Sequence, residues 1–284
     1  MISFSKRCLN LFFKDKSNLF FSLLAVFIIV GLYVLFLGDM IVQGMENMPK
    51  ARYLMDSWMM AGLLSVVPVT TTMGAFGTMV NDRSAKIVKD FTCSPAKRTN
   101  IVGGYIISSF IIGILMSVVS FILIEIYVVA EGGEFVSALT LVKTTGLILL
   151  STFSNMSIVL FITSFFSSIN AFATASTILG TMIGFITGIY IPVGTLPGAI
   201  QWVIKLFPVS HSASLFRQVL MQRPISLTFA GAPADTISEF EQSMGIIFKF
   251  GKFEAGPIIN IVVLIFTAVL FYSLSVLNIC RKQK

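Results

Sequence analysis

The 284-residue sequence contains 56% hydrophobic and only 12% charged residues, with a net charge of +7 and a mean hydropathy of +0.91. Water-soluble domains carry about 25% charged residues, so this composition excludes an ordinary soluble globule and predicts an all-α integral membrane protein. We expect a single transmembrane domain over residues 1–284, and we attribute the positive charge to membrane topology rather than to a nucleic-acid partner.

Residues 1–18 are predicted to form an amphipathic helix in the inner membrane interface. Phe4, Cys8, Leu11 and Phe12 share one helical face, and the four basic residues of the segment lie towards other faces. Those cations would then lie near anionic lipid headgroups, in contact with the membrane surface. A solvated lead-in to the first span is the alternative.

Six apolar runs, each free of Asp, Glu, Lys, Arg and His, predict six transmembrane helices. A charged residue at the centre of a span costs at least about 2.5 kcal/mol on insertion scales, so six charge-free runs are a strong signal. The first run is too long for the core of a signal peptide, and we expect it to stay in the mature protein. The runs are Leu19–Gly38, Ser57–Val80, Ile101–Ile124, Thr144–Phe166, Ala171–Ile191 and Pro257–Ile279.

The distribution of Lys and Arg predicts that both termini are cytoplasmic. With the N-terminus inside, the inner segments hold twelve of the twenty basic residues and only three acids. Basic residues in short loops near span ends favour the inner side. These inner segments are 1–18, 81–100, 167–170 and 280–284.

Residues 192–256 form the longest predicted extracellular segment. Its first part, Pro197–Met221, is too apolar for a solvated loop, and Pro208 divides it into two pieces that are each too short to span. We therefore expect an outer re-entrant helical hairpin between spans five and six. A small amphipathic helix is expected at Thr236–Phe250, while the role of residues 222–256 stays open.

No sequence motif indicates catalysis or cofactor binding. His211 has no carboxylate within sequence reach and is interpreted as an ordinary interfacial residue, and Gly245–Phe253 lacks the spacing and the Ser or Thr of a phosphate loop. The three cysteines show no metal-ligand spacing. We therefore expect no enzyme activity, no metal and no cofactor on this chain. Glu125, close to a span, is either a proton or cation site or a side chain that reaches the outer interface.

The inner loop Asn81–Asn100 has five cations and an apolar set at Ile87, Val88 and Phe91 that shares one face of a short helix. Such a helix suits docking into the groove of a soluble partner, although a plain positive-inside loop explains the charge equally well. The candidate coupling residues are Arg83, Ser84, Lys86, Ile87, Val88, Asp90, Phe91, Ser94 and Pro95.

Span five carries Gly180, Gly184 and Gly188 at four-residue steps, which predicts one smooth helical stripe. Small residues at this spacing let two helices approach closely, either within the subunit or at a dimer seam. A pathway through the bundle would have only neutral polar groups to line it, and hydrogen bonds between helices account for these groups equally well. They are Ser65, Thr70, Thr71, Thr72 and Asn155.

Three stretches resemble the ABC-2 type permeases, particularly the drug-resistance-type exporters of Gram-positive bacteria. They are residues 12–39, the junction CSPAKRTNIVGGYIIS at 93–108, and the proline-punctuated run 191–220 with its Arg217. The junction is similar to the family pattern of Ser-Pro, a basic residue and an apolar-Gly start of span three. The outer segment after Arg217 is longer than in the shorter members of the family.

The resemblance implies a half-transporter in the bacterial cell membrane. Two six-helix permeases, identical or paralogous, would work with two copies of an ABC ATPase that carries the ATP and Mg²⁺. The segment Ser84–Pro95 would be the coupling helix, and span five with the outer hairpin would lie near the dimer interface. We therefore expect the permease subunit of an ABC exporter of hydrophobic or amphipathic cargo, such as a drug, peptide or lipid. A secondary transporter or channel not driven by ATP is the alternative.

Overall fold

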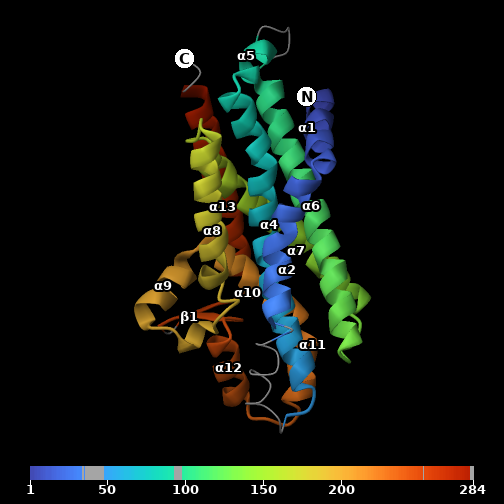
Figure 1. Ribbon diagram of the computed structural model, residues 1–284. Coiled ribbons are helices and arrows are strands. Elements are labelled where there is room, and N and C mark those ends of the chain that lie inside the picture. Colours follow the sequence, from blue (N-terminus) through green and yellow to red (C-terminus); the bar gives the residue numbers. More distant parts are fainter. Residues whose placement is uncertain (34, 36–47, 93–97, 252, 282–284) are drawn as a thin grey trace.

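The computed structural model describes residues 1–33, 35, 48–92, 98–251 and 253–281, and the chain forms an elongated, mostly helical bundle (Figure 1). Within this part, five helices are long and apolar enough to cross a membrane. They correspond to predicted spans two to six. The five are α4 (Ala51–Ser84), α6 (Arg98–Ala130), α7 (Ala138–Thr163), α8 (Ile169–Ile186) and α13 (Pro257–Arg281).

The first predicted span lies partly outside the described residues. Helix α2 (Lys16–Leu32) covers its beginning, but its predicted end at Gly38 falls among residues that the structure does not describe. The described part of the chain therefore supports five of the six predicted spans, and the first span stays a prediction.

The two ends of the bundle differ in what they carry. Helix α1 (Ile2–Lys14), the short α5 (Ile87–Thr92) and the end of α13 lie at one end, which we name the terminal end. The opposite end, named the hairpin end, carries all elements between α8 and α13 (Figure 1). These are η2 (Val193–Thr195), α9 (Gly198–Leu206), α10 (Pro208–Leu220), α11 (Gln222–Thr228), α12 (Ala234–Ser243), β1 (Phe248–Phe250) and β2 (Phe253–Ala255).

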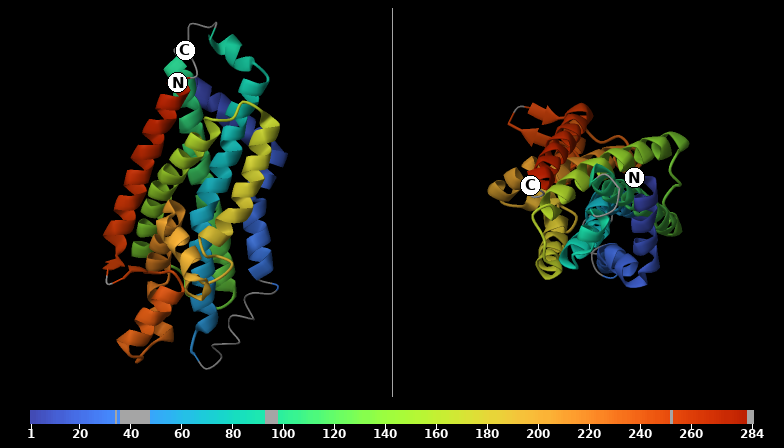
Figure 2. Two further views of the ribbon diagram at one scale, coloured as in Figure 1. Left: turned by 90° about the vertical axis from the view of Figure 1, so that its left-hand side faces the viewer. Right: turned by 90° about the horizontal axis from the view of Figure 1, so that it is seen from above.

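Helix α4 is the centre of the bundle. It packs against α2, α6, α7, α8 and α10, and Figure 2 shows it between α8 on one side and α1 and α2 on the other. It begins at Ala51, six residues before the predicted start at Ser57, and so includes Arg52 and Asp56. The predicted boundary is wrong because the carboxylate of Asp56 is matched inside the protein: it accepts a hydrogen bond from the Tyr33 hydroxyl at 2.8 Å and lies 3.5 Å from Arg52 Nε.

Helix α1 packs against α6 and α4. Its predicted apolar face is largely turned inward, since Cys8 and Phe12 are buried and Phe4 packs against the core, whereas Leu11 is exposed. Burial raises the pKa of the Cys8 thiol. The helix is amphipathic as predicted, and its apolar face contacts the bundle itself.

The segment between α8 and α13 divides at Pro208 as predicted, and the two helices on either side of that proline behave differently. Almost all of α10 is buried, whereas α9 exposes Trp202, Val203 and Leu206. The predicted helix at Thr236–Phe250 is only partly right. Helix α12 ends at Ser243, Gly245 follows with a φ of 68°, and residues 248–250 pair with 253–255 as antiparallel strands.

Candidate functional site

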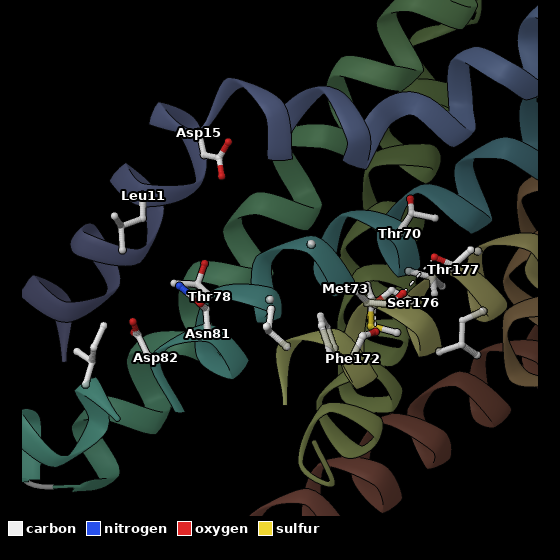
Figure 3. A pocket seen from close by; sticks show the side chains of 18 of the residues that line it. Leu11, Asp15, Thr70, Met73, Thr78, Asn81, Asp82, Phe172, Ser176 and Thr177 are labelled. Atoms are coloured by element: carbon white, nitrogen blue, oxygen red, sulfur yellow. Dashed lines mark hydrogen bonds between the residues drawn. The ribbon is translucent and has the colours of Figure 1, made fainter. Parts of the chain in front are cut away.

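A cavity of about 980 Å³ lies between α4 and α8 in the half of the bundle next to the terminal end. Its lining on α4 runs from Val69 to Asp82, and its lining on α8 runs from Ile169 to Gly180. Arg7 and Leu11 of α1, Asp15 directly after α1, and Ile87 of α5 line its terminal end (Figure 3). The cavity therefore joins two membrane helices to the two short helices outside the spans.

The cavity lining is neutral at membrane depth. On α4 the lining residues recur every three to four positions, so that a single face of the helix borders the cavity. Their hydroxyls are largely engaged within their own helices: Thr70 donates to the Val67 carbonyl at 3.1 Å and Thr177 to the Ala173 carbonyl at 3.1 Å. Such a surface suits an apolar or amphipathic molecule better than an ion. The remaining membrane-depth lining residues include Met73, Gly74, Gly77, Thr78, Phe172, Ser176 and Leu179.

Of the five predicted pathway residues, the structure places only Thr70 on the cavity. Ser65, Thr71, Thr72 and Asn155 are completely buried between helices. Thr71 donates to the Val67 carbonyl at 2.7 Å, and the Asn155 amide donates to the Ser65 carbonyl at 3.2 Å. The hydroxyls of Ser65, Thr71 and Thr72 donate to carbonyls of their own helix, so among these four residues the hydrogen bond between helices is the one from Asn155 to Ser65. The sequence prediction did not include Met73, Thr78 and Thr177, which line the cavity, because the type of a residue does not say which face of its helix it occupies.

A short helix, α5, lies where the coupling helix was predicted, and it follows a turn with Lys86 at a φ of 61°; its coupling role stays a prediction. Asp90 lies on the exposed side of α5, and Ser84 at the end of α4 and Lys86 in the turn before α5 are also exposed. Ser94 and Pro95 lie outside the described residues. Val88 is half-buried, and Arg83 donates towards the carbonyls at the end of α7, at 3.4 and 3.5 Å.

The apolar face of α5 is turned towards the helical bundle. The ring of Phe91 lies edge-on to Phe4 with 5.2 Å between centroids, and the Arg7 guanidinium lies 5.0 Å from the Phe91 ring centroid. Ile87, one turn earlier, lines the cavity. The side of α5 that a soluble partner could contact in this structure is therefore its charged side.

An ion pair ties α1 to the end of α4. Arg7 donates from Nη1 to Asp82 Oδ2 at 2.9 Å and from Nη2 to Oδ1 at 3.2 Å, and the Tyr105 hydroxyl of α6 donates to the same carboxylate at 2.5 Å. The hydrogen bond to Asp82 raises the pKa of the Arg7 guanidinium. Because bidentate charged pairs have a fixed geometry, the pair fixes the position of α1 against the ends of α4 and α6.

The three glycines of span five do not form one stripe. Gly180 borders the cavity with open space around it, and Gly184 lies against the ring of Tyr190. Helix α8 ends at Ile186, and Gly188 has a φ of 66° in the turn that follows. The Ile189 N–H donates to the Gly184 carbonyl and the Gly188 N–H to the Phe185 carbonyl, which is a Schellman ending that requires a left-handed residue. The predicted four-residue stripe is therefore wrong at Gly188.

A second polar site lies at the hairpin end around Arg217 of α10. This side chain is fully buried. Its guanidinium donates to the carbonyls of Gly188 at 2.9 Å, Thr187 at 3.2 Å and Gly245 at 3.3 Å, and lies 4.9 Å from the Trp58 ring centroid. Burial lowers the pKa of Arg217 to about 9, which leaves it charged at neutral pH.

Two ionisable residues at the hairpin end differ from their predicted settings. His211 is buried rather than interfacial: its ring nitrogens lie 2.7 Å from Asn260 Oδ1 on α13 and 2.9 Å from the Lys205 carbonyl. Glu125 is also buried and accepts a hydrogen bond from the Val136 N–H at 2.9 Å, so it does not reach the surface. Neither residue borders the cavity.

Residues 44–277 match the family model described as ABC-2 family transporter protein. The match runs from before α4 into α13, so it includes both helices of the cavity and the whole segment that carries Arg217, and it leaves out α1 and α2. No curated protein gives a significant match to this chain.

Proposed function

Because the chain belongs to the ABC-2 family of transporter proteins, we propose that it is the permease subunit of an exporter driven by a separate ABC ATPase. The family and the five apolar helices make it a multi-pass membrane transport protein. The observation that carries the proposal is the cavity between α4 and α8, which lies at membrane depth, has neutral walls there, and reaches the terminal end.

The distribution of basic residues supports a cytoplasmic terminal end in the bacterial cell membrane. ATP and Mg²⁺ would be bound by two ATPase copies, each in contact with α5. Asp90 on the exposed side of α5 and Lys86 in the turn before it would contact the ATPase. Phe91 would transmit its movement to α1 by way of Phe4 and Arg7.

A second permease, either a copy or a paralogue, would cover the open side of the cavity. Only 17% of the apolar stretch of α8 is buried, and the helix exposes Ile178, Met182 and Phe185. An exposed apolar face at membrane depth contacts either lipid or another membrane helix. We assign the face of α8 beside Gly180 to the second permease, and the exposed face of α13 to lipid.

The walls of the cavity favour a hydrophobic or amphipathic cargo. Membrane-depth residues such as Met73 and Phe172 would contact its apolar part. Arg7, Asp15 and Asp82 line the cavity at its terminal end, where a polar headgroup would lie. The charged groups of the cavity are therefore confined to one end of it.

Reconstitution tests the ATP requirement directly. Permease and ATPase are placed together in liposomes containing an NBD-labelled phospholipid or a lipophilic dye, and movement of the probe is followed with ATP, without ATP, and with an imposed proton or sodium gradient. We expect movement only with both the ATPase and ATP. Movement driven by the gradient in liposomes that lack the ATPase would support a secondary transporter instead.

A further inference from the structure

We propose that Arg217 is a gating residue that keeps the pathway closed at the hairpin end by holding the end of α8 against α4. This role rests on the proposed transport function, because it assigns the exit side of the same pathway. The Arg217 contacts join three parts of the chain: the turn after α8, the loop after α12, and α4 through Trp58.

The helices that border the cavity come together beyond it. Lining residues stop at Val69 on α4 and at Gly180 on α8, and no residue nearer the hairpin end borders the cavity. Further along, Gly62 of α4 faces Ile189, which follows α8. A Cβ atom added to Gly62 would lie 2.6 Å from Ile189 Cγ1 and 3.5 Å from Arg217 Nη2. The hairpin half of the α4–α8 pair is therefore closed by direct packing, and Arg217 lies at that contact.

The Arg217 guanidinium meets the negative end of α8. The carbonyls of Thr187 and Gly188 belong to the last turn and the ending of this helix, where unpaired carbonyls and the helix dipole favour a cation. The backbone around the guanidinium is kept open by glycine, since a Cβ atom at Gly245 would lie 3.0 Å from Arg217 Nη1. The backbone carbonyls and the glycine thus form a binding site that is shaped for one guanidinium group.

The partners of Arg217 explain why this contact can act as a gate. A buried cation is costly unless its donors are satisfied, and the three carbonyls that accept hydrogen bonds from Arg217 are neutral. Two of the three acceptors move with the end of α8. If α8 separated from α4, the guanidinium would lose them while still buried. The charge therefore favours the closed arrangement, and opening requires α10 and the end of α8 to move together.

A thiol probe measures this closure without cargo, ATP or ATPase. Thr177, an exposed lining residue of α8, is changed to Cys in a chain whose Cys8, Cys93 and Cys280 are replaced by Ala. Membrane vesicles are treated with a membrane-impermeant maleimide from either side. Labelling from the terminal side is the internal control and should be equal in all variants, because that side of the cavity is open.

With Arg217 present, labelling from the hairpin side should be slow. Arg217→Met should accelerate it at least about tenfold, the change expected when one hydrogen bond from a charged donor is lost. Arg217→Lys should lie between, because an ammonium cannot reproduce the fork of the guanidinium. Gly62→Val pushes Ile189 away without changing the charge, and it should also accelerate labelling. This variant tests the proposal if Arg217→Met does not reach the membrane.

His211→Leu is the matched control. It removes a polar side chain from the same helix, equally buried, whose partners are on α13 and at the end of α9 rather than on α8. Its labelling from the hairpin side should stay slow. Arg217 would be a purely structural residue if Arg217→Met and Gly62→Val were labelled as slowly as the parent, or if His211→Leu were labelled as fast as Arg217→Met. Neither outcome depends on whether ATP drives transport.

Discussion

The two halves of the α4–α8 pair show how one pair of helices can be open at one end and closed at the other. Next to the terminal end, the facing positions carry small or neutral residues such as Gly77, Thr78 and Gly180, and a cavity separates the helices. Towards the hairpin end, Trp58 of α4 and Arg217 of α10 are both buried and lie in contact, and Gly62 of α4 packs against Ile189. The difference teaches that, on the proposed gating role of Arg217, side-chain packing and one buried charge decide access from each side, while α4 continues through both halves and α8 ends at Ile186, just before its contact with Gly62 through Ile189.

The largest change in stability is expected from removing a large buried side chain at the hairpin end of the α4–α8 pair. Trp58→Ala should lower the free energy of unfolding by about 3–5 kcal/mol, the usual cost of truncating a large buried aromatic residue. The change also removes the hydrogen bond from Trp58 Nε1 to the Met244 carbonyl oxygen, which is 2.8 Å long, and the aromatic ring that the Arg217 guanidinium contacts. Thermal unfolding in detergent measures the loss. Trp202→Ala on exposed α9 is the control and should cost under about 0.5 kcal/mol; equal losses would contradict the comparison.

The next largest effect is expected at the open half, where Asp82 joins α1, α4 and α6. Asp82→Asn should cost about 1.5–3 kcal/mol, because two charged hydrogen bonds from Arg7 lose their acceptor. A double-mutant cycle with Arg7→Gln should show strong non-additivity. Asp90→Asn, exposed on α5, is the matched control and should change little. Additive effects of the Arg7 and Asp82 changes would show that the ion pair does not join the helices.

A smaller effect is expected on the contact with the ATPase. Lys86→Glu reverses an exposed charge in the turn just before α5, and a rim charge mainly alters association. Co-purification of the ATPase should fall several-fold and should depend on salt concentration. Phe91→Leu keeps an apolar side chain against Phe4 and should leave co-purification nearly unchanged. The opposite ranking would mean that Phe91 turns outward to dock in the ATPase.

The smallest expected effect is a change in the alkylation rate of the Cys8 thiol, which should be slow in the parent protein. Its thiol is buried and burial raises its pKa, so little thiolate is available and alkylation at neutral pH should be slow. In Asp82→Asn, loosening of α1 should make this thiol measurably faster to react, with Cys93 and Cys280 replaced by Ala. Unchanged alkylation in that variant would indicate that α1 stays docked without its ion pair.

Much of the fold follows from the sequence because long apolar runs have few stable arrangements other than membrane helices. Spans two to six, α5 and the break at Pro208 were predictable for this reason. The start of α4 was not, since the charges of Arg52 and Asp56 mark a span boundary in sequence but are matched inside the protein by each other and by Tyr33.

The candidate site was less predictable because it depends on helix rotation and on distant partners. Thr70, Thr71 and Thr72 are adjacent in sequence, yet only Thr70 borders the cavity. Arg217 lay in a stretch that resembled the permease family, but its acceptors come from the end of α8 and from Gly245, about thirty residues away in each direction. Local spacing contains no information about such contacts.

Filling the cavity tests the central claim most directly. Gly180→Leu places a side chain in the open space between α4 and α8, whereas Gly146→Leu adds the same volume at an exposed, open position of α7. In liposomes with the ATPase, the Gly180 variant should lose most ATP-driven movement of the NBD-labelled phospholipid or dye, and the Gly146 variant should retain it. Full transport by a correctly assembled Gly180→Leu protein would contradict a pathway between α4 and α8.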